Sequence, residues 1–454
     1  MSEYARPAYR VGVARLAITP PPGTLLVGYA ARTGAAADVH DDLFAHAIVV
    51  DDGTRTAAIV CADLLSVHPD VVGPARGIVA QRTGLDPSCV MIAATHTHSG
   101  PPAAVTPVMD ERERAYVAWL PFQVAGAVEL AMRRRSPARL AVARGIVRAG
   151  VNRRQVLPDG RVVIGEDPAG PVDPYLTLIR IEREDGAPAA LVVHYGCHPV
   201  CLGPDNLSVS ADYPGSLRAT VESVIGVPCI FWQGTGGDVN PRGRSNPGWH
   251  LVDSVARALA TEIGRLWHGP GWAELSGPVG AARRTLVLPV VTAPEPTEAS
   301  LRELKPFVAS GSLAALREML DRRLPWSAQL APPVRPGEPV GALMEVQCVR
   351  IGGLAVVGLA AEPFAEIGLA IREAVEDRSG PHPGRCVVVG YANGCVGYLP
   401  SRRAHQMGGY EVDEAYLVYR LPGPLAAGVG EEVVSEAVQL ARKLLANGVR
   451  SPQG

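Results

Sequence analysis

The stretch CVMIAATHTHSGPP, at residues 89–102, is an apolar run that leads directly into a polar turn. Its first half is typical of a buried strand. If the strand continues, its alternation places His96 and His98 on one face, where both can point into a cleft. Histidine is the commonest metal ligand, so two imidazoles at a strand exit suit a metal ion. Two hydrogen-bonded structural histidines would explain the motif equally well.

The same change from apolar run to polar loop recurs along the chain. Further buried strands are expected at residues 44–52, 56–65, 177–185, 189–198, 228–234, 344–352, 354–362 and 386–394. Apolar residues at helical spacing predict amphipathic helices at residues 111–135, 213–226, 249–267, 363–377 and 430–448. The pattern predicts a mixed α/β (α+β) fold, in which helices flank a large central mixed β-sheet.

Composition narrows the class of protein. The chain has 454 residues, of which 47% are hydrophobic, so it can bury a large core. With 43 basic and 45 acidic residues the net charge is −2, and no overall field would attract nucleic acid. The N-terminus lacks the pattern of a secretory signal, and no run of about 18 apolar residues predicts a transmembrane segment. We therefore expect a cytoplasmic protein; its oligomeric state is not readable from the sequence.

We expect one domain over residues 1–454. Residues 269–339 are richer in proline and bracket a helical pattern at 300–323, which predicts an insertion within that domain.

Three other strand exits carry polar residues. His198 follows the apolar run 189–195 and is a better ligand candidate than His194, which lies inside that run. Glu362 ends another apolar run, where a carboxylate is costly unless it is paired or binds a metal; a helix-capping role explains it as well. The turn GGDVNP at residues 236–241 lets backbone approach a ligand closely, although a plain tight turn would also need its glycines.

In this order the motifs resemble the N-terminal catalytic domain of the neutral/alkaline non-lysosomal ceramidases. The matching segments are GVARLAITPPPG (12–23), ADLL (62–65), ATHTHSGP (94–101), VNRR (151–154), VHYGCHPV (193–200), GGDVNP (236–241), AAEPF (360–364) and YANGCVGY (391–398). The resemblance implies one zinc ion per chain and hydrolysis of an N-acyl amide.

The resemblance also implies roles for particular residues. His96, His198, Glu362 and Tyr398 would be the zinc ligands. His98 would lie just outside the ligand shell and hold the substrate or the attacking water. Arg153 would position the substrate.

Two departures from the family pattern stand out. Asn240 occupies the place of the family's hexapeptide serine, where its amide could donate to the substrate but could not act as a nucleophile. Because the sequence stops soon after its last expected helix, we also expect it to lack the C-terminal immunoglobulin-like domain that the resemblance would imply.

These features predict a zinc-dependent hydrolase that uses a metal-activated water on an amide, ester or lactone of a small-molecule or lipid-like acyl substrate. Ceramide itself is a doubtful substrate because the serine is replaced. One alternative is a zinc Lewis-acid acyltransferase or cyclase of specialised metabolism. Another is a non-catalytic metal-binding protein.

Overall fold

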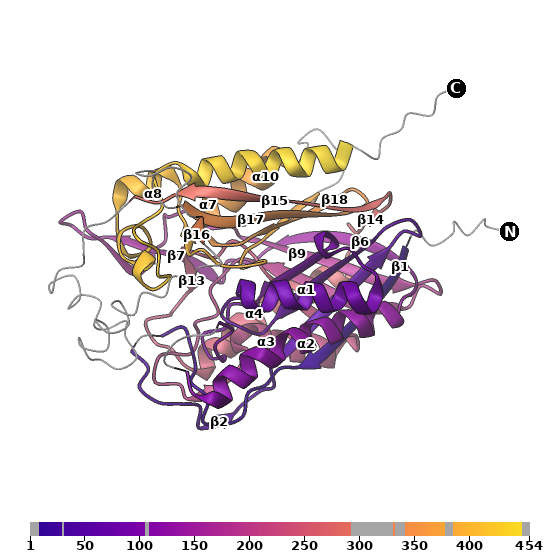
Figure 1. Cartoon of the computed structure of the whole chain (residues 1–454), viewed down its shortest axis with the longest axis horizontal. Helices are drawn as coiled ribbons and strands as arrows, with labels where there is room; N and C mark the ends of the chain where they lie inside the picture. The colour runs from indigo at the N-terminus through magenta and orange to yellow at the C-terminus, as the bar shows by residue number, and fades with distance from the viewer. Residues whose placement is uncertain are drawn as a thin grey trace.

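The computed structural model describes residues 9–29, 31–104, 109–291, 330–331, 341–376 and 385–446. Two β-sheets are stacked face to face, and helices cover the outer face of each, so that the molecule has four layers (Figure 1). The mixed α/β fold and the central mixed sheet are confirmed. The second sheet, which covers the other face of the central one, was not expected from the sequence.

The central sheet has nine strands. Its order is β12-β10-β9-β6-β1-β3-β4-β5, with β14 paired to β6. The strands are β1 (Tyr9–Ala17), β3 (Phe44–Asp51), β4 (Thr56–Ala62), β5 (Val90–Ala94), β6 (Ser136–Ile146), β9 (Tyr175–Arg183), β10 (Pro188–Tyr195), β12 (Cys229–Gln233) and β14 (Ala273–Leu275). The β4–β5 and β10–β12 pairs are parallel, and the other pairs are antiparallel.

The second sheet has the order β15-β17-β18-β20, with β16 paired to β17. Its strands are β15 (Val279–Pro289), β16 (Leu330–Ala331), β17 (Gly341–Ile351), β18 (Leu354–Leu359) and β20 (Cys386–Val389). Smaller pairings join β7 (Gly150–Val156) to β8 (Val162–Asp167) and β13 (Val239–Pro241), β2 (Asp38–Val39) to β11 (Ser208–Val209), and β19 (Glu362–Pro363) to β21 (Tyr398–Leu399).

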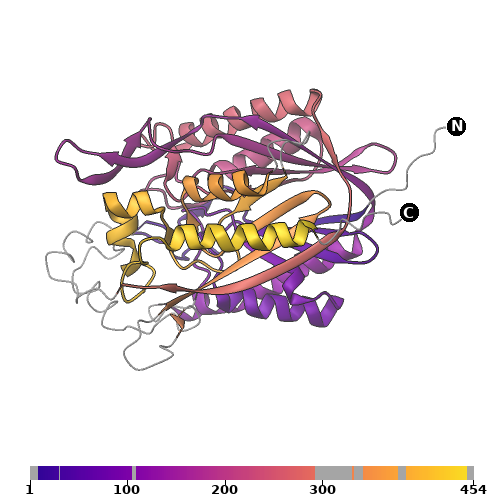
Figure 2. The same ribbon diagram turned by 90° about the horizontal axis from the view of Figure 1, so that it is seen from above.

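Helices pack on the two outer faces. Four helices cover the central sheet: α1 (Pro69–Thr83), α2 (Glu111–Arg133), α3 (Asp212–Ile225) and α4 (Trp249–His268). On the opposite side lie α7 (Ala365–Val375) and α10 (Val429–Ala446); α10 crosses the second sheet in the view of Figure 2. Along the chain, the short helices α8 (Arg402–Met407) and α9 (Tyr410–Asp413) come after β21 and before α10.

Helix α2 shows how the sequence defines an element. Asp110 accepts a hydrogen bond from the backbone of Glu113, whose carboxylate accepts one from Asp110 N, so a capping box begins the helix. Leu120, Val124 and Val128 follow at four-residue spacing and are buried against the central sheet. By length and composition α2 could cross a membrane, but half of its most apolar window is buried inside the fold, as in a core helix.

The two sheets share one core. Ile59 and Met91 of the central sheet and Val356 of the second sheet belong to the same buried cluster. The sheets approach closely at Gly358, where a Cβ atom would lie 2.8 Å from Met91 Cε. Because neither sheet could bury this face alone, we propose that the described residues form a single domain.

The predicted boundary of the insertion is wrong at its start. Residues 273–289, inside the expected 269–339 segment, form β14 and β15 and belong to the two main sheets. Proline and glycine here mark the loops that flank strands rather than a departure from the fold. Residues 292–329 and 332–340, which include the expected helix at 300–323, lie outside the described residues.

Candidate metal centre

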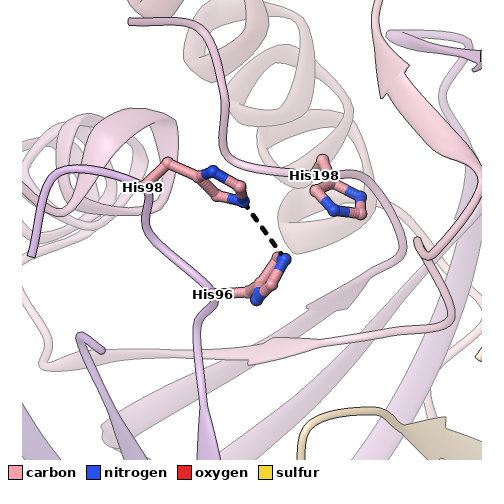
Figure 3. Close-up of side chains that lie close together, drawn as sticks. All are labelled: His96, His98 and His198. Carbon is pink, nitrogen blue, oxygen red and sulfur yellow. Dashed lines mark hydrogen bonds between the residues drawn. The ribbon is translucent and has the colours of Figure 1, made fainter. Parts of the chain in front are cut away.

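Three histidine side chains converge where strands end. His96 and His98 follow β5, and His198 follows β10; their nearest ring nitrogens all lie within 4.8 Å of one another (Figure 3). Each of these strands has a parallel neighbour, and ligand sites form at the carboxyl ends of parallel strands. His96 and His198 are buried, whereas His98 is partly exposed.

The route by which His96 and His98 meet differs from the prediction. Strand β5 ends at Ala94, and His96 has a left-handed backbone with φ of 70°. The two rings are therefore not placed by strand alternation; they meet at an interplanar angle of 89°. A non-glycine residue in this conformation costs energy, and such strain is concentrated at functional sites.

All three rings are oriented by backbone carbonyl groups. Nδ1 of His96 lies 2.6 Å from Leu65 O, Nδ1 of His98 lies 2.9 Å from Gly28 O, and Nδ1 of His198 lies 2.5 Å from Gly236 O. A carbonyl only accepts, so each Nδ1 carries the proton and each neutral ring presents an unprotonated Nε2. This is the tautomer required of a metal ligand.

The Nε2 atoms face other acceptors. His96 Nε2 lies 3.2 Å from His98 Nε2 and 3.2 Å from Glu362 Oε2, and the same carboxylate oxygen lies 3.3 Å from His198 Nε2. Lone pairs at this distance repel unless a proton or a cation lies between them. The nitrogen and oxygen donors therefore fit a divalent cation such as zinc.

The charge states agree with a cation site. Burial, with the positive charge of Arg153, lowers the pKa of His198 to about 4. Burial and the neighbouring His96 hold the pKa of His98 well below its usual value. Burial alone would raise the pKa of Glu362, but its histidine contacts outweigh burial and hold that pKa low. Near neutral pH, His98 and His198 are therefore unprotonated imidazoles and Glu362 is a carboxylate, and these three side chains surround His96.

Two tyrosines that the sequence did not single out as site residues support Glu362. Tyr391 stacks on His96 with ring centroids 3.9 Å apart, and its hydroxyl donates to Glu362 Oε2 at 3.4 Å. Tyr419 donates its hydroxyl hydrogen to Glu362 Oε1. Oε1 is therefore held by Tyr419, while Oε2 faces the histidines. Tyr419 lies 57 residues after Glu362 in a loop that matches no motif, so only the fold brings it here.

Arg153 contacts His198, one of the three histidines. Its Nη1 is 3.2 Å from His198 Nε2, and its Nε donates to Glu411 Oε1 at 2.8 Å. Arg154 donates to the other oxygen of Glu411 at 2.6 Å, so one buried carboxylate of α9 holds two arginines of β7. Glu411 was not predicted, because a single acidic residue in a short helix carries no sequence signal.

Tyr398 is also brought to this region. It pairs directly with Glu362 across the parallel β19–β21 bridge, and the Arg153 guanidinium lies 5.1 Å from its ring centroid. Burial raises the pKa of Tyr398 despite the nearby Arg153, so the free side chain is a neutral phenol that can donate a hydrogen bond.

Asn240 is buried on β13, opposite Val151 of β7. Directly paired residues share a face of a sheet, so Asn240 is on the face that also carries Arg153. Among the described residues its Oδ1 has no hydrogen-bond partner. No hydrogen bond joins it to the three histidines within the described chain, so the structure puts Asn240 near the arginine rather than in the histidine group.

Two interpretations of neighbouring residues are now resolved. His194 hydrogen-bonds Val388 O at 2.9 Å inside the core, as favoured for a structural histidine. For the glycines of GGDVNP the sequence left open a close approach to a ligand or a plain tight turn. In the structure they make room for backbone: a Cβ on Gly237 would lie 2.6 Å from Glu362 O, and one on Gly236 would lie 2.9 Å from Cys197 N. Both glycines let the strand exits pack together beneath the site.

The chain is similar to known ceramidases in sequence and in fold. Residues 9–232 match the family described as neutral/alkaline non-lysosomal ceramidase, N-terminal. The neutral ceramidase of Pseudomonas aeruginosa is 25% identical over 468 residues, covering 89% of this chain and 68% of that protein. The crystal structure of neutral ceramidase from P. aeruginosa superimposes with a TM-score of 0.74 at 19% identity, covering 99% of this chain and 76% of the other. A ceramidase complexed with C2 gives the same TM-score and identity over 99% and 77% of the two chains.

The fold, the family match and the buried polar site define a hydrolase of carbon–nitrogen bonds. Within that class, the chain is similar to the neutral/alkaline non-lysosomal ceramidases, whose N-terminal family model matches residues 9–232.

Proposed function

We propose that the protein is a zinc-dependent amidase that hydrolyses the amide bond of a lipid-like N-acyl substrate. The observation that carries the proposal is the convergence of His96 Nε2, His198 Nε2 and Glu362 Oε2, with every Nδ1 committed to a backbone carbonyl. The name of the P. aeruginosa relative, neutral ceramidase, supports an N-acyl lipid as the substrate class.

These three residues are the proposed metal ligands. Three protein ligands with one open position are typical of catalytic zinc. A zinc ion bound here would polarise the acyl carbonyl and lower the pKa of water. Glu362 is held for this task by Tyr419 and Tyr391.

The remaining residues are proposed to act on the substrate. His98 has an unprotonated Nε2 and is partly exposed, so it can accept a proton from the attacking water and return it to the leaving amine. Tyr398 is the strand partner of Glu362, and its hydroxyl would contact the metal or donate to the developing oxyanion. Arg153 and Asn240 lie on one face of β7 and β13 and would position the polar part of the substrate.

Hydrolysis in water enriched in oxygen-18 tests the proposal. The purified zinc-loaded protein is incubated with N-lauroylethanolamine, and the released laurate is analysed by mass spectrometry. We expect one labelled oxygen per laurate released, and loss of release after chelation of the metal. Consumption of the amide without release of laurate would instead indicate acyl transfer or cyclisation. No turnover of a broad set of N-acyl amides by the loaded protein would contradict the amidase assignment.

A further inference from the structure

A tyrosine next to His98 is flanked by two arginines that the proposed mechanism does not use. The Tyr29 ring lies 5.0 Å from the His98 ring, measured between centroids. The guanidinium carbon of Arg32 lies 5.0 Å from the Tyr29 centroid, and that of Arg244 lies 5.6 Å from it. Arg244 Nη2 also donates to the Tyr29 hydroxyl at 3.1 Å. Two cations thus lie one aromatic ring away from the histidine group.

Arg32 is buried without a counter-ion. Only 3% of the residue is exposed. Its Nε donates to Asn206 O at 3.0 Å and its Nη1 to Val27 O at 3.2 Å, while Nη2 has no partner among the described residues. Burial lowers the pKa of Arg32 to about 10, a cost that a carboxylate would remove. Burying a guanidinium that has an unused hydrogen-bond donor costs free energy unless an anion accepts that hydrogen bond and balances the charge.

The protein does not supply that anion in the part of the chain that the structure describes. Asp212 is the carboxylate whose charge acts on Tyr29, but its oxygens accept hydrogen bonds from the backbone N–H groups of Cys201, Leu202 and Tyr213. Neither Arg32 nor Arg244 forms an ion pair with Asp212 or with any other described carboxylate.

The rest of the site does not offset this charge. Glu411 is shared by Arg153 and Arg154, and Glu362 is engaged by the histidines. A divalent metal would add further positive charge. Such a site attracts anions and lowers the barrier to their approach.

From these contacts we infer that Arg32 and Arg244 bind an oxyanion carried by the substrate, so that the preferred substrate is an N-acylated amine bearing a carboxylate or a phosphate. Both groups match the guanidinium fork in shape and charge. This inference rests on the proposed amidase function. It narrows the substrate class, because a neutral amide would leave the buried charge of Arg32 without a counter-ion.

Three substrates with the same acyl chain test the inference. N-Lauroylglycine carries a carboxylate, N-lauroylphosphoethanolamine carries a phosphate, and N-lauroylethanolamine is neutral. We expect the wild-type kcat/KM for at least one anionic substrate to exceed that for the neutral one by about 10-fold or more, as charge-assisted hydrogen bonds would give. The more rapidly cleaved anion identifies the oxyanion.

Variants assign the preference to the arginines. Arg244→Gln should lower kcat/KM for the preferred anionic substrate by about 10- to 100-fold, mainly through KM, and leave the neutral substrate within about 2-fold. Arg32→Gln should act in the same direction. Arg242→Gln is the matched control, because Arg242 is exposed in the same loop and its Nε donates to Arg148 O.

The outcomes separate the inference from the proposed function. Equal kcat/KM for neutral and anionic substrates would refute the oxyanion site but not the amidase function. The same would follow if Arg244→Gln lowered kcat/KM equally for all three substrates. If none of the three substrates is cleaved, calorimetric titration with N-lauroylglycine and N-lauroylphosphoethanolamine still tests whether the two arginines bind an oxyanion. Binding weakened by Arg244→Gln supports the oxyanion site although the amidase fails, and absence of binding, or binding unaffected by the variant, refutes it.

Discussion

At the scale of single residues, the proposed metal site depends on how one carboxylate is held. Glu362 Oε2 faces His96 and His198, and Oε1 accepts the hydroxyl hydrogen of Tyr419. A group that orients a metal ligand sets both the geometry and the affinity of the site. Tyr419 is thus a positioning residue that acts through Glu362.

Removing the Tyr419 hydroxyl should weaken metal binding. We expect Tyr419→Phe to lower zinc affinity by about 10- to 100-fold, because Oε1 loses its donor and the carboxylate can rotate. Competition with a chromophoric chelator measures this affinity directly. Tyr175→Phe is the control, because Tyr175 lies on β9 and packs against Arg144 and Arg372. Equal zinc affinity in Tyr419→Phe and in the wild type would show that Glu362 needs no such support.

The sequence predicted part of this site for physical reasons. His96, His198 and Glu362 each follow an apolar run, and a strand that ends in a polar residue is visible in a single sequence. Tyr419 and Glu411 could not be found in this way. Both lie between residues 410 and 420, in short helices and loops whose position depends on packing against β7 and β19. Similarly, the left-handed backbone of His96 leaves no pattern in the sequence.

At the scale of elements, the site exists because strand exits from different parts of the chain pack backbone against backbone. Gly237 of the turn before β13 lies under β19, and its N–H donates to Pro363 O at 2.9 Å. The pairing of β19 with β21 then brings Glu362 beside Tyr398. Most predicted strands and helices appear within a few residues of their expected bounds, because their periodicity is strong. Several strands were missed, among them β1, β6, β7, β8, β13 and β15. Of these, β13 is short and β7 is rich in polar residues.

A methyl group at Gly237 should displace Glu362. In Gly237→Ala the new Cβ would lie 2.6 Å from Glu362 O and 2.9 Å from Pro363 O, so β19 must shift. We expect loss of bound zinc and a free energy of unfolding lower by about 1–3 kcal/mol, as for other overpacked sites. Metal analysis and urea unfolding measure the two effects.

Gly264→Ala is the matched control for that variant. Gly264 lies inside α4, and a Cβ there would meet no atom within 4 Å. This change should keep zinc and stabilise the protein by up to about 1 kcal/mol. Retention of zinc and full stability in Gly237→Ala would mean that the close approach is not required.

At the scale of the whole molecule, buried neutral histidines couple folding to pH. His46 is 3% exposed in the central sheet, and burial holds its pKa well below the usual value. In the unfolded chain it takes up a proton below about pH 6.5, whereas the folded form does not. The unfolded state therefore binds more protons, and the stability that His46 contributes above pH 6.5 is lost as the pH falls.

Replacing His46 should flatten this dependence. Between about pH 5 and 6, one such histidine adds about 1.4 kcal/mol per pH unit to the slope of the unfolding free energy. We expect His46→Leu to lower the slope by that amount, measured by urea unfolding at several pH values. An unchanged slope would show that His46 is protonated in the folded protein. His250→Leu, at an exposed position, should leave the slope as in the wild type.

If His96, His198 and Glu362 hold a metal ion, elemental analysis of the purified protein will detect it. We predict about one zinc per chain in the wild type, little in His198→Ala, and an unchanged content in His98→Ala and His250→Ala. Loss of zinc in His98→Ala would make His98 a ligand rather than a proton carrier. A wild-type protein that holds no metal even after zinc is supplied would show that these three residues do not form a metal site.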